Sequence, residues 1–416
     1  MSTILICGGK KLCGEVEVQG SKNAALPILA ATLLSGSESI IHNCPDLADV
    51  RGALKIIECL GGKCEYRDRT AVINTENVKK CEIPDSLMSC MRSSVLFLGA
   101  IISRLGRASV SYPGGCAIGL RPVDLHIKAF RELGVEIEEI CGNIYCNAEK
   151  IRPATIDLKF PSVGATENIM LLSAISDGET VITNAAREPE IVDLQNFLNA
   201  MGAKISGAGS EIIRIIGVEK LHKVEYNIIS DRIFSATVAC AVAACGGDVH
   251  MKGAQAEHMR LMLSMLRDAG CEAECTENGV RIGCGGRLCG LGKIITSPYP
   301  GFPTDAQALF MSACCTADGT TAFVENIFEN RYRHVSELIK MGADIIVDGR
   351  LAVVSGCNYI QGASIAACDL RGGAALVAAG LSAIGDTEIS GVEHIDRGYE
   401  SIETTFASLG AQIKRK

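Results

Sequence analysis

The chain contains 416 residues, 48% of them hydrophobic, and carries a formal net charge of −8. This length exceeds one ordinary hydrophobic core and the composition excludes disordered and fibrous classes, so we expect two globular domains. No basic run is longer than two residues before the last three, KRK, which argues against a general nucleic-acid-binding surface.

The N-terminal segment MSTILICGGKK has an apolar run of only four residues, Ile4 to Cys7, before glycine and lysine. Such a run is too short for a secretory signal or a membrane anchor. No apolar run elsewhere reaches the roughly 20 residues that a spanning helix needs. We therefore expect a cytoplasmic protein with no membrane partner.

The chain holds 20 cysteines, which a reducing cytosol keeps mostly as thiols that pack like small hydrophobic residues. Apolar helical runs around four of them fit this role: Cys240, Cys245, Cys314 and Cys315. No C-x-x-C spacing occurs, and the segment CEAEC at 271–275 alternates with charged residues like a strand. We therefore expect no metal site.

A pattern of about 70 residues recurs six times along the chain. In each copy an amphipathic helix ends at a glycine, and a short strand follows. The copies read CLGGKCE, ELGVEIE, AMGAKIS, DAGCEAE, KMGADII and SLGAQIK, with glycines at 61, 134, 202, 270, 342 and 410. Glycine suits the position after a helix end because it enters the left-handed conformation at little cost.

A more apolar helix precedes each amphipathic helix, as in KNAALPILAATLLSG and RGGAALVAAGLSAIGD. Because these helices are apolar on most faces, we expect them to be buried. Each is followed by a run typical of a strand: ESIIHN, RASVSYP, ETVITNA, GDVHMKG, TTAFVEN and TEISGVE. The repeated unit is therefore α-β-α-β-β.

The last copy stops soon after Gly410, short of its final strand. The N-terminal segment ILICGGKKLCGEVEVQG has the pattern of a strand pair that can complete it. We therefore predict one domain of three repeats over 22–229, and a second of three repeats formed by 1–21 with 230–416.

Polar groups mark one end of the apolar helices, which begin at or beside Lys22-Asn23, Arg92, Ala165, Asp231-Arg232, Asp305 and Arg371. Asparagine and aspartate at such positions are commonly helix caps. A cation at a helix start opposes the helix dipole, however, so Lys22 and the arginines indicate a bound anion.

Three sets of motifs carry a resemblance to a known family. GSKNAALPILAATLL, PGGCAIGLRPVDLHI and the C-terminal set FPTDAQA, ENRYRHV, DLRGGAAL and HIDRGYE resemble the UDP-N-acetylglucosamine 1-carboxyvinyltransferases, which are enolpyruvyl transferases. The similarity runs from Lys22 to the last helix and includes AAREPEIVDLQNFL at 185–198. It implies an α/β fold of two inverted α/β barrels, each with three repeats, and an active site between them.

The resemblance also implies a reaction. The enolpyruvyl group of phosphoenolpyruvate passes to the 3′-hydroxyl of UDP-N-acetylglucosamine, and phosphate leaves, by addition and elimination through a tetrahedral phospholactoyl intermediate. This is the first committed step of peptidoglycan precursor synthesis, and thus of cell wall biogenesis, cell shape and division. No cofactor is implied, and an epoxide phosphonate of the fosfomycin type is the expected inhibitor.

By resemblance Cys116 is the acid that protonates C3 of phosphoenolpyruvate, and it also forms a covalent adduct at C2. Cysteine suits this position because Gly114, Gly115 and Gly119 give the loop freedom, while Arg121 raises the local positive potential. Asp305 is by resemblance the base that faces the 3′-hydroxyl, although without the family it would more often be a helix cap.

Phosphoenolpyruvate carries a phosphate and a carboxylate, which cationic side chains bind. By resemblance its binding residues are Lys22, Asn23, Arg121, Arg397, Arg371 and Arg331. Without the family, Arg331 would equally suit a solvated surface position. Those for UDP-N-acetylglucosamine are Asn23, Arg92, Arg121, Pro122, Val123, Asp124, Leu125, Ser162, Val163, Gly164, Asp305 and Ile327. The segment FPSVGATEN offers backbone N–H groups at a helix start for the diphosphate.

The chain departs from the family in two places. Some members have a lysine where Phe160 stands, and Phe234 and Ala236 replace an expected acidic residue and glycine. Two alternatives stay open: a 5-enolpyruvylshikimate-3-phosphate synthase-like transferase, which lacks the Gly-Gly-Cys loop, and a non-catalytic regulator that binds UDP-sugars. We expect a monomer or a weak homo-oligomer.

Overall fold

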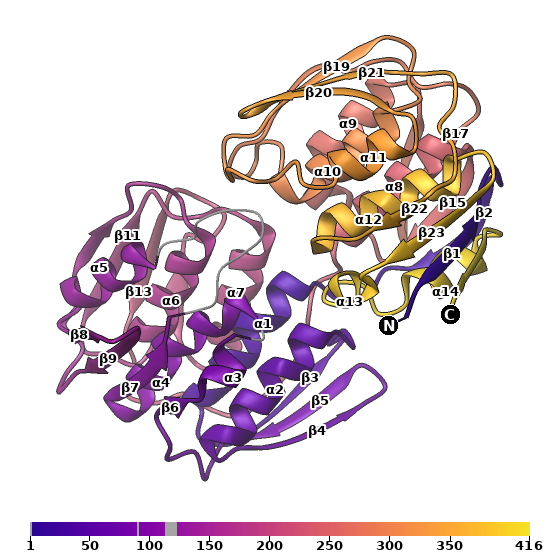
Figure 1. The fold of residues 1–416 in the computed structure, drawn as a ribbon. Coiled ribbons are helices and arrows are strands. Elements are labelled where there is room, and N and C mark those ends of the chain that lie inside the picture. The colour runs from indigo at the N-terminus through magenta and orange to yellow at the C-terminus, as the bar shows by residue number, and fades with distance from the viewer. Residues whose placement is uncertain (1, 90, 113–122) are drawn as a thin grey trace. The chain divides into compact units, whose positions relative to one another are not determined.

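The computed structural model describes residues 2–89, 91–112 and 123–416 (Figure 1). The described residues form six four-stranded sheets of one topology. In each sheet an outer strand runs parallel to a central strand, the central strand pairs antiparallel with a third, and the third pairs antiparallel with a fourth. The six-fold repeat predicted from the sequence is thereby confirmed.

The three sheets of the N-terminal half are β14(Val224–Asn227)-β3(Glu38–His42)-β5(Thr70–Asn74)-β4(Lys63–Arg67), β6(Glu82–Ile83)-β7(Arg107–Ser111)-β9(Asn143–Asn147)-β8(Glu136–Ile140) and β10(Thr155–Asp157)-β11(Glu179–Thr183)-β13(Ile212–Ile216)-β12(Lys204–Ser206). The three sheets of the C-terminal half are β2(Leu12–Glu17)-β15(Gly247–Lys252)-β17(Gly279–Cys284)-β16(Glu272–Thr276), β18(Gly292–Ile295)-β19(Thr320–Val324)-β21(Leu351–Ser355)-β20(Asp344–Asp348) and β22(Ser364–Ala366)-β23(Asp386–Ser390)-β1(Ile4–Cys7)-β24(Gln412–Arg415).

Two kinds of helix alternate with these strands. The apolar helices, which are buried over most of their length, are α1(Lys22–Ala31), α4(Phe97–Leu105), α6(Val163–Ser173), α8(Arg232–Cys245), α10(Thr304–Cys314) and α12(Leu370–Ser382). The helices of the second kind are α2(Ala48–Leu60), α5(Asp124–Glu132), α7(Pro189–Ala200), α9(Arg260–Asp268), α11(Val335–Lys340) and α14(Ile402–Ser408). Short helical turns complete the chain: α3(Asp85–Met88), α13(Val392–Ile395), η1(Thr32–Leu34), η2(Arg92–Leu96) and η3(Ala256–Met259).

The glycine that follows each helix of the second kind has the left-handed backbone that the sequence predicts. The φ angles are +109° at Gly61, +87° at Gly134, +104° at Gly202, +102° at Gly270, +90° at Gly342 and +93° at Gly410. A side chain at these angles would be strained, so the repeated glycine is explained by backbone geometry.

The chain divides into two compact units, one of residues 2–19 with 230–416 and one of 20–112 with 123–229. The two N-terminal strands both pair within the first of these units. β1 lies between β23 and β24, so it supplies the strand that the last repeat lacks. The expectation that both strands complete this repeat is wrong, because β2 pairs with β15 and completes the fourth repeat instead.

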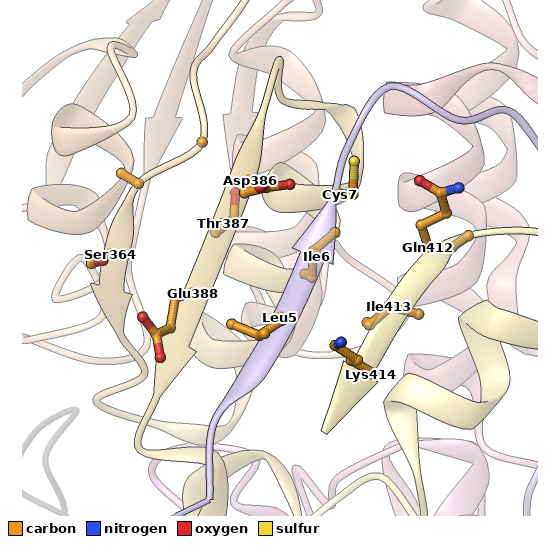
Figure 2. A pocket seen from close by; sticks show the side chains of 13 residues that line it. Leu5, Ile6, Cys7, Ser364, Asp386, Thr387, Glu388, Gln412, Ile413 and Lys414 are labelled. Carbon is orange, nitrogen blue, oxygen red and sulfur yellow. The ribbon is translucent and has the colours of Figure 1, made fainter. Parts of the chain in front are cut away.

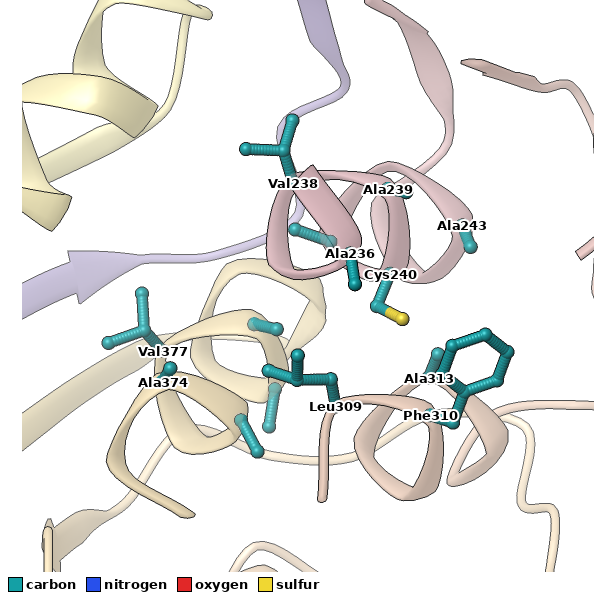
Figure 3. Packing of buried hydrophobic residues seen from close by; sticks show 14 of the residues in the cluster. Ala236, Val238, Ala239, Cys240, Ala243, Leu309, Phe310, Ala313, Ala374 and Val377 are labelled. Atoms are coloured by element: carbon teal, nitrogen blue, oxygen red, sulfur yellow. The ribbon is translucent and has the colours of Figure 1, made fainter. Parts of the chain in front are cut away.

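Each unit has its own hydrophobic core around its apolar helices. In the C-terminal unit α8, α10 and α12 pack against one another, and Figure 3 shows Cys240, Leu309 and Phe310 among the side chains that meet there. In the N-terminal unit α4 packs against α1 and α6. A Cβ at Gly99 would lie 2.5 Å from the Asn168 carbonyl oxygen, so glycine is required where α4 meets α6.

The repeat also decides where polar side chains collect. The outer and central strands of each sheet are parallel, so their carboxyl ends lie at one edge. In the fifth repeat α10 follows the outer strand β18 in sequence and begins near that edge. Likewise, α6 follows β10 and α12 follows β22.

Candidate active site

Asp305 lies between two arginines at the start of α10, in the C-terminal unit. Arg331 Nη2 is 2.9 Å from Asp305 Oδ1, and Arg371 Nη2 is 3.2 Å from Oδ2. Both arginine side chains are 3% exposed, whereas the Asp305 side chain is 27% exposed. The carboxylate is therefore the part of this cluster that a ligand reaches most easily.

The local backbone explains how Asp305 is held. Pro303 is extended and precedes α10 without a side-chain cap. Arg331 contacts the carbonyl side of this helix start, because its Nε and Nη2 atoms donate to the Thr304 carbonyl oxygen at 3.3 and 3.2 Å. One buried guanidinium thus binds both the first helical residue and the carboxylate of the second.

Arg371 is fixed by several contacts. Asp369 caps α12, and its Oδ1 accepts hydrogen bonds from the backbone N–H groups of Arg371 and Gly372 at 3.1 and 2.9 Å. Arg371 Cζ lies 5.8 Å from the centroid of the Tyr399 ring. Burial lowers the pKa of the Arg371 guanidinium, but the negative charge of Asp305 and further contributions from Tyr399 and Asp231 raise that pKa more strongly.

The cluster of Asp305, Arg331 and Arg371 thus carries two cations for one carboxylate. Neighbouring cations favour the ionised form of an acid. An ionised carboxylate that a ligand can reach is able to accept a proton from a hydroxyl group. The geometry therefore holds an oriented carboxylate, partly exposed, between two arginines.

Lys22 in the N-terminal unit has a carboxylate partner. It is the first residue of α1, after Ser21, whose hydroxyl accepts a hydrogen bond from the Ala24 N–H group at 3.3 Å. Lys22 Nζ lies 2.7 Å from Asp49 Oδ2, and the Asp49 side chain is only 3% exposed. A protein carboxylate therefore compensates the cation at this helix start, where the sequence had indicated a bound anion. Asn23, the next residue of α1, is half-buried.

The start of α6 and the start of α5 meet through a histidine. Ser162 caps α6 and accepts a hydrogen bond from the Ala165 N–H group at 3.3 Å, while Val163 and Gly164 form the first turn. A Cβ at Gly164 would lie 3.2 Å from Cε1 of His126, so the small residue makes room for the imidazole. The predicted nucleotide residues of these two segments are thus near one another.

Asn168 orients this histidine. Its Oδ1 accepts a hydrogen bond from the Gly99 N–H group at 2.9 Å, and its Nδ2 lies 3.0 Å from the Val95 carbonyl oxygen and 2.8 Å from His126 Nδ1. Because Nδ2 is a donor, Nδ1 must accept, and the proton of the neutral ring resides on Nε2. On α5 itself, Val123 is buried, Leu125 is half-buried and Asp124 is exposed.

Two other predicted residues lie in the C-terminal unit. The Ile327 N–H group donates to Glu325 Oε1 at 2.8 Å, just beyond β19. Arg397 is half-buried between α13 and α14.

Several predictions fall outside the described part of the chain. Cys116, Arg121 and Pro122 belong to the segment 113–122, and no side-chain geometry is described for Arg92, the first residue of η2.

Among the described residues, the cysteines are free thiols, and no group of three or more potential metal ligands occurs. Cys240, Cys314 and Cys315 are buried and Cys245 is half-buried, which confirms their role in packing. Burial raises the pKa of Cys245 to about 12 and that of Cys314 to about 11, so both are poor nucleophiles. No helix in the described part of the chain is long and apolar enough to cross a membrane.

A groove of about 820 Å³ lies over the sheet β22-β23-β1-β24, as Figure 2 shows. Leu5 and Cys7 of β1, Glu388 of β23 and Lys414 of β24 contribute to its lining. It contains none of the predicted site residues, so the candidate site is not this groove.

Sequence reasoning missed several residues that hold the site together. Asp49 is 27 positions in sequence from Lys22, Asn168 is 42 positions from His126, and Tyr399 is 28 positions from Arg371. An acidic residue in the first turn of α2 had an ordinary explanation as a partner of the helix dipole. Only the tertiary contacts reveal their roles.

Comparison with known proteins identifies the family of this chain. The family model described as EPSP synthase (3-phosphoshikimate 1-carboxyvinyltransferase) matches residues 6–406. The chain therefore belongs to this family of enolpyruvyl transferases.

Full-length relatives narrow the resemblance further. A protein of Caldanaerobacter subterraneus named UDP-N-acetylglucosamine 1-carboxyvinyltransferase 2 is 52% identical over 415 residues, covering 100% of both chains. A Geobacter metallireducens protein named UDP-N-acetylglucosamine 1-carboxyvinyltransferase is 47% identical over 415 residues, covering 100% of this chain and 99% of its own. The resemblance found in the sequence motifs is confirmed.

Solved structures agree with the fold. The enolpyruvyl transferase NikO from Streptomyces tendae is 25% identical and superposes with a TM-score of 0.88, covering 100% of this chain and 99% of that one. An EPSP synthase from Acinetobacter baumannii, at 18% identity, superposes with a TM-score of 0.77 over 100% of both chains. The predicted enolpyruvyl transferase fold is confirmed.

Proposed function

We propose that this protein transfers the enolpyruvyl group of phosphoenolpyruvate to the 3′-hydroxyl of UDP-N-acetylglucosamine and releases phosphate, in peptidoglycan precursor synthesis. The names of relatives that match the whole chain at 45–52% identity support this function. The structural observation that carries it is Asp305, partly exposed at a helix start with each carboxylate oxygen bound by an arginine. Such a group suits deprotonation of a sugar hydroxyl.

The chemistry needs a base and an acid. Asp305 takes the proton of the 3′-hydroxyl as the sugar oxygen bonds to C2 of phosphoenolpyruvate, and an acid gives a proton to C3, which becomes a methyl group. In the elimination step that follows, C3 loses a proton and the C2–O bond to phosphate breaks. Its electron pair leaves with phosphate, and the C2–C3 double bond forms again. No cofactor takes part in these steps.

Cys116 is our candidate for the acid at C3 and for a covalent adduct at C2. Its support is the motif PGGCAIGLRPVDLHI, in which Gly114, Gly115 and Gly119 flank Cys116 in sequence and Arg121 follows. The described cysteines offer a contrast, because burial raises the pKa of Cys64 and Cys146 to about 12.

Cations bind the two anionic groups of phosphoenolpyruvate in this proposal. Lys22, Arg121 and Arg397 form the main set, and Asn23 assists. Arg331 and Arg371 serve mainly through Asp305, which both contact.

The nucleotide sugar occupies the starts of α5, α6 and η2. The backbone N–H groups at Val163 and Gly164 suit a diphosphate, because the first turn of a helix leaves such groups without intrahelical partners. Arg92, Arg121 to Leu125, Ser162 and Ile327 complete this set.

The protein acts on small molecules. We expect it to work in the cytoplasm as a monomer or weak homo-oligomer, with 22–229 as one domain and 1–21 plus 230–416 as the other. Sedimentation velocity tests the oligomeric state.

A phosphate-release assay tests the function. With phosphoenolpyruvate, UDP-N-acetylglucosamine is expected to support turnover, whereas shikimate 3-phosphate is not. Turnover with shikimate 3-phosphate alone would favour the other branch of the family, and no turnover with either would contradict transferase activity.

An epoxide phosphonate of the fosfomycin type tests the role of Cys116. Mass spectrometry is expected to locate one adduct on Cys116, and Cys116→Ser to abolish it. Cys289→Ser is the matched control, because Cys289 is an exposed thiol that the reagent can reach. An adduct on Cys289 in place of Cys116 would contradict the assignment.

A further inference from the structure

Glu325 is a fully buried carboxylate, 0% exposed, directly after β19. In the part of the chain that the structure describes, no cationic side chain forms an ion pair with it. Four hydrogen bonds from neutral donors satisfy it instead. Oε1 accepts from the Thr296 hydroxyl at 2.9 Å and from the N–H groups of Ile327 and Phe328 at 2.8 and 3.1 Å, and Oε2 accepts from the Thr304 hydroxyl at 3.0 Å.

These bonds join three segments at one edge of the sheet. Thr296 directly follows β18, Glu325 directly follows β19, and the two strands are parallel. Thr304 is the first residue of α10. A single side chain therefore fixes the helix start, the end of the neighbouring strand and the turn at Ile327.

Two of these segments carry candidate site residues. Thr304 precedes Asp305, and the Thr304 carbonyl oxygen accepts the hydrogen bonds of Arg331. Glu325 thus holds the hydroxyl side of Thr304, while Arg331 holds its carbonyl. The other oxygen of the carboxylate binds the backbone at Ile327, which belongs to the proposed nucleotide-sugar site.

The corner after the central strand can be compared between repeats; the second repeat has Tyr112 there, and like Glu325 it has no left-handed φ. The residue after the central strand has a left-handed backbone in four repeats, with φ of +51° at Asn43, +53° at Asn184, +78° at Gly253 and +70° at Gly391. The two asparagines close their corners by donating to the carbonyl oxygens of Ile228 and Leu158, at 3.0 and 2.6 Å. Asparagine or glycine is therefore sufficient to close the corner.

The fifth repeat has glutamate at this position, and its φ is not left-handed. Its carboxylate reaches the start of the apolar helix, which neither asparagine does in the bonds described above. Burying a carboxylate is costly unless its hydrogen bonds are satisfied. A function at the helix start explains why the fifth corner differs.

We propose that Glu325 is a positioning residue, which holds the Asp305 carboxylate and the Ile327 backbone in the relative geometry that the acceptor sugar requires. This inference rests on the proposed function. Glu325 acts through Thr304 and the backbone and takes no part in bond making. Its loss is therefore expected to affect the acceptor sugar more than phosphoenolpyruvate.

The test is the variant Glu325→Gln, which keeps the size of the side chain. Its amide oxygen still accepts the N–H bonds of Ile327 and Phe328, but its amide nitrogen can meet the Thr304 hydroxyl only as a donor, so a neutral hydrogen bond replaces the charge-assisted one. We expect KM for UDP-N-acetylglucosamine to rise about tenfold, the size of one charge-assisted hydrogen bond, with KM for phosphoenolpyruvate within about twofold.

Thr304→Val is also expected to raise KM for UDP-N-acetylglucosamine and to leave KM for phosphoenolpyruvate nearly unchanged. The double variant is expected to have the same KM for UDP-N-acetylglucosamine as Glu325→Gln alone, because both changes act on the same hydrogen bond. Thr321→Val is the matched control. Thr321 is a buried threonine of the same strand, β19, whose hydroxyl accepts a hydrogen bond from the Leu291 N–H group at 2.9 Å. It is expected to lower the melting temperature without changing either KM.

Several outcomes would overturn the inference. One is that Glu325→Gln has the same KM values as wild type. Another is that Glu325→Gln changes both KM values equally and that its effect adds to that of Thr304→Val in the double variant. Inactive wild-type protein would instead contradict the proposed function itself, and this inference with it.

Discussion

The two compact units use opposite charge arrangements at their helix starts. In the N-terminal unit a cation, Lys22, is held by one buried carboxylate, Asp49. In the C-terminal unit a carboxylate, Asp305, is held by two buried arginines. The first arrangement pairs one lysine with one buried carboxylate, whereas the second pairs two buried arginines with one partly exposed carboxylate.

This difference fits the different roles that we propose for Lys22 and Asp305. A compensated lysine suits the binding of an anion at a fixed place, because it stays charged without a ligand. A carboxylate with two arginine partners keeps its orientation while a proton moves. In the proposed function, the same repeated architecture supplies a binding group in one unit and a base in the other.

Asp305→Asn would break the C-terminal arrangement and has the largest expected effect. An amide cannot accept the hydroxyl proton, so kcat is expected to fall about 100-fold to 10,000-fold. Phosphate release measures this rate. An unchanged melting temperature is the control, and a kcat within about threefold of wild type would contradict the role of base.

Asp49→Asn would break the N-terminal arrangement. It leaves Lys22 without its carboxylate at a helix start, and removing one partner of a buried pair costs about 3 kcal/mol of unfolding free energy. Urea unfolding measures this loss. Asp46→Asn is the matched control, because the Asp46–Arg51 pair is exposed and is expected to cost less than about 1 kcal/mol. Equal losses of unfolding free energy in the two variants would contradict a special role of the buried Lys22–Asp49 pair.

Asp193 makes the N-terminal unit sensitive to rising pH. Burial raises the pKa of Asp193 from 3.8 to about 6, despite hydrogen bonds from the Tyr226 hydroxyl and the Ile229 N–H group. Its stabilising contribution is therefore complete below pH 3.8 and is lost as the pH rises through 6. Between pH 4 and 7 wild type is expected to lose about 2 kcal/mol relative to Asp193→Asn in urea unfolding. Parallel pH curves would contradict this.

His334 gives the C-terminal unit the opposite sensitivity. Burial, helped by Arg331, lowers the pKa of His334 from 6.5 to about 4, and Asp369 raises it only in part. The stabilising contribution is complete above pH 6.5 and is lost as the pH falls toward 4, because the unfolded chain binds the proton first. At pH 5 wild type is expected to have lost about 2 kcal/mol relative to His334→Gln, compared with pH 7. Urea unfolding at both pH values measures the difference, and an equal loss in the variant would contradict it.

Phe160→Lys is the smallest expected change and would sharpen the comparison by adding a cation to the N-terminal unit. Phe160 is 43% exposed and precedes the start of α6, so a lysine there has room to reach a bound diphosphate. The dissociation constant of UDP-N-acetylglucosamine is expected to fall about threefold to fivefold, as for an exposed ion pair. Calorimetric titration measures it, with Phe160→Gln as the uncharged control; an equal gain in both variants would point to lost hydrophobic surface instead.

The sequence determined the repeat, because each copy carries its own local signals. Six left-handed glycines, six apolar helices and the strands after them follow from backbone conformation and side-chain pattern within short segments. The packing role of Cys314 and Cys315 follows from the apolar helix around them. The candidate residues came from motifs, and the roles of Cys116 and the substrate-binding residues stay predictions.

Tertiary structure alone decided which distant residues meet. The pairing of Lys22 with Asp49, the binding of Asp305 by Arg331 and Arg371, and the reach of Glu325 to Thr304 each join segments from different elements. The sequence also did not determine that β2 pairs with β15 in the fourth repeat, because the pattern of an outer strand is compatible with each of the six sheets. Local patterns fix conformation and burial, whereas partners at long range depend on how the folded backbone brings helix starts and strand ends to the same edge.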